Sequence, residues 1–368
     1  MYDVMIVGSG IVGLVNACML AQHTDLRIGL LAQSLSPVWS PIEYDARVLA
    51  ITPASQRIFG ELGIWSFIES KRISPFTHMR VWDAYGSGKI HFNHSPALGF
   101  IVEENLIRAA LYEKLITYSH VEILSDNRTC RLLIGADGAH SMVREKANIA
   151  MHTHDYHHTA IIAKVQTELP HQKTAWQCFL GSSGSLAFLP LSHSHECSIV
   201  WSTTPEEAAL FLSLDETAFS EKITQAFSMQ LGTVKLTSKL YSFPLHERHV
   251  KNYVKEGLAL IGDAAHTLHP LAGQGVNLGI ADAACLAKVI ISAVNKKRDF
   301  SSLHTLRRYE RNRKGHNAMM LIAVKTLKAL FTSDQKSLQF LRNQGLSLTD
   351  QAIFLKKYFS QYAMGTHV

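Results

Sequence analysis

Six residues near the N-terminus, Gly8–Gly13 (GSGIVG), constrain the fold of this chain more than any other segment. They follow the apolar run Tyr2–Val7, which predicts a buried parallel strand, and precede a helical pattern over Leu14–Gln22. Arg27–Ala32 then predicts the next parallel strand. In such a unit the glycines permit a tight turn, a close approach to a pyrophosphate, and close helix–strand packing. The spacing therefore predicts a Rossmann-like dinucleotide site.

Two later segments carry similar chemistry. Gly135–Arg144 (GADGAHSMVR) follows the predicted strand Arg131–Ile134. Ala259–Asp282 (ALIGDAAHTLHPLAGQGVNLGIAD) predicts a buried strand, a Gly-Asp turn, a loop and the start of a helix. Glycine turns and helix N-termini present backbone N–H groups to anions. The sequence contains no second G-x-G-x-x-G segment in a strand–helix context. We therefore expect three distant segments to hold one cofactor, and any second redox cofactor to bind transiently.

The remaining pattern predicts an α/β fold in which two domains are interleaved. We expect a Rossmann-like domain from residues 1–75, 101–150 and 251–290, and an antiparallel-sheet substrate domain from residues 76–100 and 151–250. Residues 291–368 predict a C-terminal helical region. The expected antiparallel strands are Met79–Tyr85, Lys89–Asn93, Thr159–Leu169, Ala175–Leu180, Gly184–Pro190, Cys197–Ser202 and Thr237–Pro244, with one helical stretch over Glu206–Leu231.

Composition limits the functional classes. Hydrophobic residues make up 47% and charged residues 18%, which favours a sizeable core and argues against wholesale disorder. The net charge of +6 favours anionic partners such as a dinucleotide or an acidic membrane surface. No basic run with interleaved aromatics is present, so nucleic-acid binding is not expected. The five cysteines form no Cys-x-x-Cys pair, which fits a reducing compartment.

Two segments are candidates for a targeting or membrane-spanning sequence, and neither fits. The first residues lack a cationic stretch before an apolar core, so we expect no signal peptide. The apolar stretch Val276–Val294 is interrupted by Asp282 and Lys288, so we do not expect it to span a membrane. These observations predict a cytoplasmic protein.

The three glycine segments together resemble the single-component FAD-dependent aromatic hydroxylases, the p-hydroxybenzoate hydroxylase-like group. Within this group, YDARVLAITPASQRIFGELGIW, MRVWDA, FLPLSHSHECSIVWS and LRRYERNRK resemble the ubiquinone-biosynthesis hydroxylases, most closely those that oxygenate a polyprenylphenol early in that pathway. The resemblance runs from about residue 2 to about residue 345. It implies a monooxygenase that uses FAD, NAD(P)H and O2 to hydroxylate the ring of a polyprenylated phenol. No side chain is required as a general acid or base, because the cofactor activates the oxygen.

The resemblance implies roles for residues around the nucleotide half of FAD. The glycines of the first motif would face the pyrophosphate: Gly8, Gly10 and Gly13. Asp137 would serve both FAD and the visiting nicotinamide cofactor, and Arg144 would support its turn. Glu103 would meet the ribityl chain or the pyrophosphate. Asp137 and Arg144 also fit a simple turn residue and a helix ion pair, and both interpretations stay open.

Other matching positions are implied to surround the flavin ring. Asp263 would accept a hydrogen bond from a ribityl hydroxyl, because a carboxylate is a strong acceptor. Arg47 would approach the flavin from the other side, and Pro270 would lie near its reactive carbon; Arg47 also fits an ordinary surface residue. The N-terminus of the last motif's helix would bind the pyrimidine edge, which is anionic when the flavin is reduced. The residues at that helix start are Gly273, Gln274, Gly275, Val276 and Asn277.

Several residues depart from the expected pattern or permit a simpler interpretation. Ala32 stands where such folds carry Asp or Glu for the ribose hydroxyls, and Gln33 either replaces that contact or merely caps the strand. The pair His266 and His269 lacks a Cys or carboxylate pattern, so we expect structural or surface roles and no metal site. Only Ser125–Cys130 precedes the strand of the second motif, where the family normally has a longer hairpin.

Partners and rival functions follow from the same resemblance. A polyprenyl tail implies an apolar tunnel and peripheral contact with the inner membrane. The C-terminal lysines fit membrane contact, a ubiquinone-biosynthesis protein complex, or a solvated helix face: Lys325, Lys328, Lys336, Lys356 and Lys357. A hydroxylase of a soluble aromatic acid stays open as an alternative. So does a catalytically idle subunit of a biosynthetic complex, which the absent acidic residue at position 32 favours.

Overall fold

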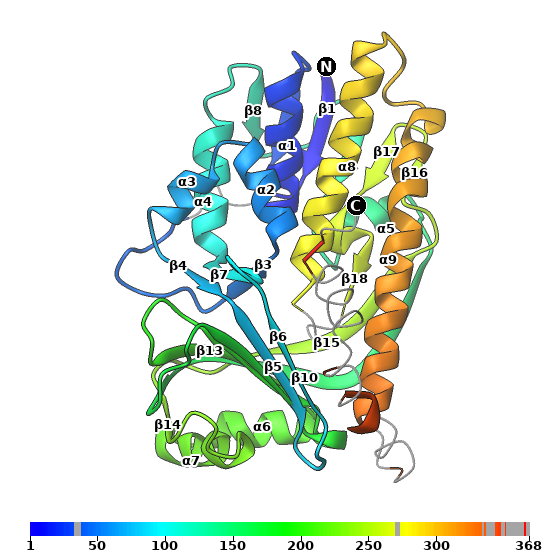
Figure 1. The fold of residues 1–368 in the computed structure, drawn as a ribbon. Coiled ribbons are helices and arrows are strands. Elements are labelled where there is room, and N and C mark those ends of the chain that lie inside the picture. Colours follow the sequence, from blue (N-terminus) through cyan, green and yellow to red (C-terminus); the bar gives the residue numbers. More distant parts are fainter. Residues whose placement is uncertain are drawn as a thin grey trace.

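Three sheets organise the structure, a computed structural model that describes residues 1–32, 38–268, 273–332, 335, 343–346, 350 and 364–365. Six strands form a mainly parallel sheet, nine form a large mixed sheet, and three form a small antiparallel sheet between them. Figure 1 shows the parallel sheet at the top and the large sheet below it. Gln33 and Pro270 lie outside the described residues, so their predicted roles stay predictions.

The parallel sheet is assembled from three distant parts of the chain, as the sequence predicts. Its strand order is β16-β17-β9-β1-β2-β8. The strands are β1 (Tyr2–Val7), β2 (Ile28–Leu31), β8 (Val121–Leu124), β9 (Cys130–Gly135), β16 (Val254–Lys255) and β17 (Leu258–Leu260). The central strand β1 pairs in parallel with β2 and β9, and β17 pairs in parallel with β9. All three glycine motifs therefore begin at the carboxyl ends of neighbouring parallel strands.

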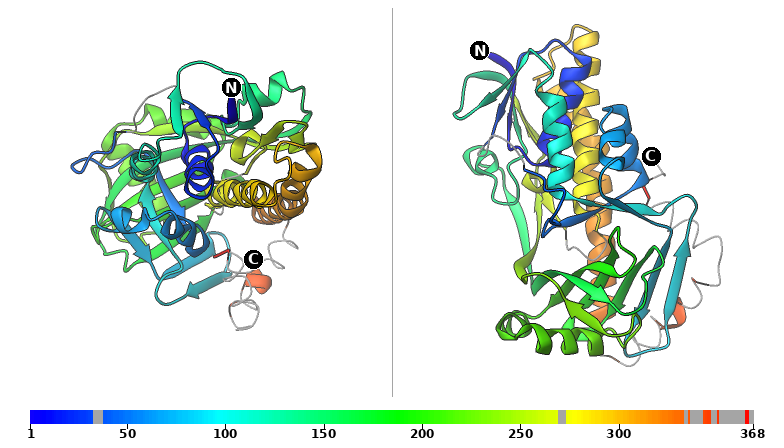
Figure 2. Two further views of the ribbon diagram at one scale, coloured as in Figure 1. Left: turned by 90° about the horizontal axis from the view of Figure 1, so that it is seen from above. Right: turned by 90° about the vertical axis from the view of Figure 1, so that its left-hand side faces the viewer.

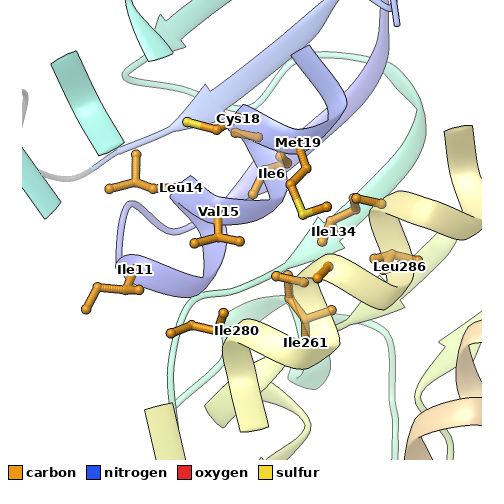
Figure 3. Close-up of a cluster of buried hydrophobic side chains, with 14 of the residues drawn as sticks. Ile6, Ile11, Leu14, Val15, Cys18, Met19, Ile134, Ile261, Ile280 and Leu286 are labelled. Atoms are coloured by element: carbon orange, nitrogen blue, oxygen red, sulfur yellow. The ribbon is translucent and has the colours of Figure 1, made fainter. Parts of the chain in front are cut away.

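Helices α1 (Ile11–His23) and α8 (Gly275–Asn295) pack together against the parallel sheet. Figure 3 shows their shared apolar cluster, which includes Leu14, Ile261 and Ile280. Each such buried side chain contributes about 1.5–3 kcal/mol relative to an exposed one. By length and composition α8 is apolar enough to cross a membrane, but 61% of its most apolar window is buried inside the protein. It serves as a core helix.

The large sheet has the order β18-β15-β10-β13-β12-β11-β5-β6, with β14 paired to β10. Helices α6 (Pro205–Ser213) and α7 (Glu216–Ala226) cover its outer face. The strands are β5 (His78–Asp83), β6 (Lys89–Asn93), β10 (Met151–Thr167), β11 (Thr174–Phe179), β12 (Ser185–Pro190), β13 (Glu196–Thr203), β14 (Val234–Leu236), β15 (Tyr241–Val250) and β18 (His266–Thr267).

Three details of this sheet correct the sequence-based expectation. The strand β11 is antiparallel to β12 but parallel to β5, so the sheet is not antiparallel throughout. The predicted helix over Glu206–Leu231 is two helices, because Leu214 is extended and Asp215 caps the second one. Both β10 and β15 are longer than predicted, and they extend toward the parallel sheet as a twisted pair.

The small sheet and the remaining helices join the two larger layers. The small sheet has the order β3-β7-β4, and α9 (Leu303–Thr332) runs beside α8 and on past the large sheet (Figure 2). The other elements are β3 (Val48–Ile51), β4 (Ile73–Phe76), β7 (Gly99–Glu103), α2 (Pro53–Glu61), α3 (Trp65–Glu69), α4 (Glu104–Leu115), α5 (Met142–Lys146), η1 (Gly181–Ser183) and η2 (Gly262–Ala264).

Candidate active site

A cavity of about 1850 Å³ lies between the parallel sheet, the large sheet and α9. All three glycine motifs line it, through Gly8–Val12, Ala136–His140, Asp263 and Gly273–Val276. Sites for one small ligand typically measure about 300–1,000 Å³. The cavity therefore has room for a cofactor and a second molecule beside it.

The glycines of the first motif have separate tasks. Gly8 has a φ of +114°, and a Cβ added there would lie 2.2 Å from the Ala136 carbonyl oxygen. A Cβ on Gly13 would lie 2.1 Å from the carbonyl oxygen of Gly8. A Cβ on Gly10, in contrast, would meet no atom within 4 Å, and Gly10 caps α1 without a side-chain hydrogen bond. Gly8 and Gly13 allow close packing, whereas Gly10 leaves free N–H groups at an open anion-binding helix end.

The N-terminus of α8 opens on the same cavity. Its first hydrogen bond runs from the Leu278 N–H to the Gln274 carbonyl, so earlier N–H groups have no acceptor within the helix. A Cβ added to Gly275 would meet no atom within 4 Å, and Gly273 has a positive φ of 58°. Gly273, Gln274, Gly275 and Val276 all line the cavity. This uncapped helix end can stabilise an anionic ligand edge.

The side chain of Asn277 does not line the cavity, and the backbone N–H contact predicted for this residue stays a prediction. Its Oδ1 accepts hydrogen bonds from the Thr52 N–H at 3.0 Å and the Ser55 hydroxyl at 2.8 Å. Its Nδ2 donates to the carbonyl oxygens of Ala50 and Gly273. Asn277 therefore fixes the start of α8 against β3 and α2, and contributes to binding by positioning the helix.

Asp263 lies on the turn η2 with its carboxylate open to the cavity. Protein surrounds it on the other sides, and this desolvation raises its pKa, although His266, Arg47 and Arg248 oppose the shift. Its carboxylate has no hydrogen-bond partner in the described part of the chain. A carboxylate so placed accepts hydrogen bonds from a hydroxylated ligand, as the ribityl role requires.

Asp137 and Arg144 shape the turn of the second motif. Asp137 lines the cavity; its Oδ2 accepts a hydrogen bond from the Val143 N–H at 3.1 Å. Its Oδ1 is buried and has no partner among the described residues, so it is available to a ligand donor. The buried Arg144 donates to the carbonyl oxygens of Ala139 and Ala264. Arg144 thus ties the second motif to the third, and it forms no ion pair with another described residue.

Arg47 lines the cavity, but Glu103 does not. Arg47 is 3.2 Å from Glu104, and its side chain is 61% exposed. Glu103 is buried behind the wall, where it accepts hydrogen bonds from Arg72 and from the Trp39 indole N–H. The expectation that Glu103 contacts the cofactor is wrong for this geometry. The helix α4 begins one residue later, which turns Glu104 toward the cavity instead.

Two arginines in the cavity wall were missed from the sequence. Arg108 follows Glu104 by one helical turn on α4, and its Nε donates to the Ser9 carbonyl at 3.4 Å. The spacing of Glu104 and Arg108, four residues apart on one helix, is the sequence signal that could have identified Arg108. Arg248 lies on β15, in a stretch too polar to be predicted as a strand. Both place positive charge where an anionic dinucleotide would bind.

A buried ionic network holds the turn that carries Asp263. Asp282 accepts hydrogen bonds from His266 Nε2 at 2.5 Å, Arg313 Nε at 2.7 Å and Asn317 Nδ2 at 3.0 Å. Burial alone would raise the pKa of Asp282, but His266 and Arg313 outweigh it and hold the value at about 2. The Gly262 N–H also donates to Asp282. The structural role predicted for His266 is confirmed, while His269 lies outside the described residues.

Comparison with known proteins identifies the family. A family model described as "FAD binding domain" matches residues 86–322. The chain is 34% identical to the ubiquinone biosynthesis monooxygenase COQ6 of Xenopus tropicalis, covering 98% of this chain and 93% of that protein. It is 32% identical to the 3-demethoxyubiquinol 3-hydroxylase of Escherichia coli, covering 99% and 98%. The chain belongs to this family of FAD-dependent monooxygenases.

Solved structures show the same fold for this monooxygenase. Pseudomonas aeruginosa PqsL in complex with 2-aminobenzoylacetate superposes with a TM-score of 0.78 at 21% identity, covering 95% of this chain and all of the other. The p-nitrophenol 4-monooxygenase PnpA of Pseudomonas putida gives a TM-score of 0.76 at 16% identity, covering 99% and 98%. The predicted α/β fold class is confirmed.

The residues present fit FAD, the cofactor of the family. Gly10 and Gly275 leave room beside two open helix ends. The carboxylates of Asp137 and Asp263 face the cavity and can accept hydrogen bonds from a ligand. When bound, FAD supplies the oxygen chemistry, with NAD(P)H as reductant and a phenol as substrate. The protein's own groups would then bind the diphosphate, Asp263 would orient the ribityl chain, and the apolar walls would exclude water. Among the described residues, no group of three His, Cys, Asp or Glu side chains is placed to bind a metal ion.

Proposed function

We propose that this monooxygenase hydroxylates the aromatic ring of a polyprenylated phenol in ubiquinone biosynthesis, using NAD(P)H and O2. The observation that carries the proposal is the apolar character of the cavity beyond the FAD motifs. The large sheet and α9 line this half with Met79, Ile90, Phe92, Val200, Leu330 and Phe331. Such a wall buries a hydrocarbon chain at roughly 25 cal/mol per Å² of apolar surface. The names of the two relatives, a ubiquinone biosynthesis monooxygenase and a 3-demethoxyubiquinol 3-hydroxylase, support the same substrate class.

The wall of the cavity also reaches the protein surface at α9. Met319 and Leu327 line the cavity and are 57% and 48% exposed, and the neighbouring Ile322 is 65% exposed. Lys325 is exposed on the same helix. We propose that this apolar and basic part of α9 rests on an anionic membrane, from which a tail enters the cavity. Association with other ubiquinone-biosynthesis proteins stays a prediction, to be tested by co-purification.

The two alternatives have less support in the geometry. A soluble aromatic acid needs a cation for its carboxylate. The arginines that line the cavity, Arg47, Arg108 and Arg248, lie toward the FAD motifs, and none of the described lining residues is a lysine. An idle subunit would have no need to keep Asp263 and two open helix ends facing one cavity.

One experiment separates these functions. The purified protein is expected to show a flavin absorbance spectrum and to oxidise NADPH faster when a short-chain prenylphenol is added. Mass spectrometry of the product should show one added oxygen atom. A colourless protein that takes up no FAD would support the idle subunit. Turnover of 4-hydroxybenzoate but not of the prenylphenol would support the soluble acid.

A further inference from the structure

Three uncharged polar side chains interrupt the apolar half of the cavity. They are Gln177 on β11, Ser185 on β12 and Ser202 on β13, and all three line the cavity. Ser185 pairs directly with Ser202, and Ser185 also pairs with Phe179, two residues beyond Gln177. Opposed residues place their Cβ atoms about 4.5–5.5 Å apart, and diagonal ones lie about 7–8 Å apart. These residues therefore form one group, called here the polar trio.

The side chains of the polar trio are buried without hydrogen-bond partners in the described structure. Gln177 and Ser185 are each 7% exposed and Ser202 is 1% exposed. Within the ranges that the structure describes, none of the three side chains has a hydrogen-bond partner. Buried polar side chains are nearly always hydrogen-bonded, so a group of three without partners requires an explanation. A ligand that enters the cavity provides one.

The polar trio carries no charge, which limits the ligand. An amide and two hydroxyls both donate and accept hydrogen bonds. Lys328 and His158 share a small void with the two serines but do not line the cavity. The Lys328 ammonium donates to the Tyr156 carbonyl and lies 4.1 Å from the centre of the Tyr156 ring. The polar trio thus fits a hydroxyl, methoxy or carbonyl oxygen better than a carboxylate.

We propose that the polar trio binds a neutral oxygen of the substrate and thereby selects among related phenols. The inference rests on the proposed function and extends it to substrate selection. This oxygen belongs either to a substituent on the ring or to a polar group on the tail. In both cases a site built to bond an oxygen rejects analogues that lack it, because its own polar groups then stay unpaired.

The test compares Gln177→Leu and Ser202→Ala with the control Ser198→Ala. Ser198 lies on the same strand as Ser202, is 4% exposed and does not line the cavity. Three short-chain prenylphenols serve as substrates: one with a ring methoxy group, one without it, and one without it but with a hydroxyl at the end of the tail. For each enzyme, KM and kcat are measured by substrate-dependent NADPH oxidation and product formation.

We expect the KM for one oxygenated substrate to rise about tenfold in Gln177→Leu and Ser202→Ala, and to stay unchanged in Ser198→Ala. The plain substrate should have the same KM in all enzymes. A rise confined to the methoxy compound assigns the polar trio to the ring, and one confined to the tail hydroxyl assigns it to the tail. Ser202→Thr, which keeps the hydroxyl, should restore the KM.

Stability separates this role from a structural one. Because Gln177 has no hydrogen-bond partner among the described residues, Gln177→Leu should leave the melting temperature of the ligand-free protein unchanged or raise it. KM values that change equally for all three substrates would overturn the inference, as would unchanged KM values throughout. A wild-type enzyme that hydroxylates none of the three overturns the proposed function itself, and the inference with it.

Discussion

At the scale of single residues, the proposed contact of Asp263 with the cofactor can be tested directly. Its carboxylate faces the cavity without a partner in the described structure. Asp263→Ala should weaken FAD binding about 10- to 100-fold, since hydrogen bonds to charged groups contribute about 1.5–3 kcal/mol. Fluorescence titration of the apoprotein with FAD measures the change. Asp263→Asn, which keeps an acceptor, should lose less; unchanged FAD affinity in Asp263→Ala would refute the role.

Asp282 gives the protein a predictable response to acid. Its pKa is about 2 in the folded protein against an ordinary 3.8, so between these values the unfolded chain binds a proton that the folded chain does not. About 2 kcal/mol of stability is therefore present above pH 4 and lost as the pH falls toward 2.

Substitution tests this acid response. Asp282→Asn leaves the Arg313 guanidinium buried without its counter-charge and should cost about 3–5 kcal/mol at pH 7. The difference from wild type in the free energy of unfolding should stay constant above about pH 4 and narrow as the pH falls toward 2, as measured by urea unfolding. The exposed Asp126→Asn serves as control, with little expected effect. If the free energies of unfolding of wild type and Asp282→Asn changed with pH in parallel, the low pKa of Asp282 would be contradicted.

At the scale of elements, the first turn of α1 separates packing from binding. Gly10→Ala introduces a methyl group into the cavity, whereas Gly13→Ala places one 2.1 Å from the carbonyl oxygen of Gly8. We therefore expect Gly10→Ala to fold with a near-normal melting temperature but to bind FAD at least tenfold more weakly. Gly13→Ala should lower the melting temperature of the apoprotein itself. Calorimetry and FAD titration distinguish the two; equal melting temperatures would show that the strand–helix packing tolerates a side chain.

The elements that the sequence predicts best are those with strong local patterns. The strand β1 and helix α1 follow an apolar run and a glycine motif, and both were predicted nearly to their ends. The long strands β10 and β15 were predicted too short, because their ends near the parallel sheet are rich in histidine and charge. The parallel pairing of β11 with β5 depends on contacts almost a hundred residues apart, which no local pattern encodes.

In the site, too, the features that depend on local sequence were predicted better than those that depend on distant contacts. Backbone roles at Gly8, Gly10 and Gly275 follow from motif spacing, because a glycine's use is local. Side-chain direction is not local: Glu103 and Asn277 lie in the right segments but point into hydrogen-bond networks behind the wall. The polar trio could not be found from the sequence, because it exists only where three strands lie side by side.

At the scale of the whole molecule, the exposed part of α9 predicts membrane attachment. Ile322 is 65% exposed and, unlike Met319 and Leu327, does not line the cavity. Ile322→Glu should therefore reduce flotation with anionic phospholipid vesicles several-fold while leaving turnover of a water-soluble short-chain phenol unchanged. The exposed Leu210→Glu on α6, beneath the far face of the large sheet, is the matched control. Equal flotation of wild type and Ile322→Glu would place the membrane contact elsewhere.

The cavity wall includes both Gly8 and Phe331, residues near opposite ends of the described chain. A ribosome adding about 5–20 residues per second needs roughly 15–65 s to make the chain between them. During that interval β1 and β2 have emerged, but β9 beside β1, β17 beside β9, and the helix α8 follow only later. The nascent enzyme therefore spends most of its synthesis with apolar strand faces uncovered. Its yield in the cell should depend on chaperones that hold such faces until the last long helix arrives.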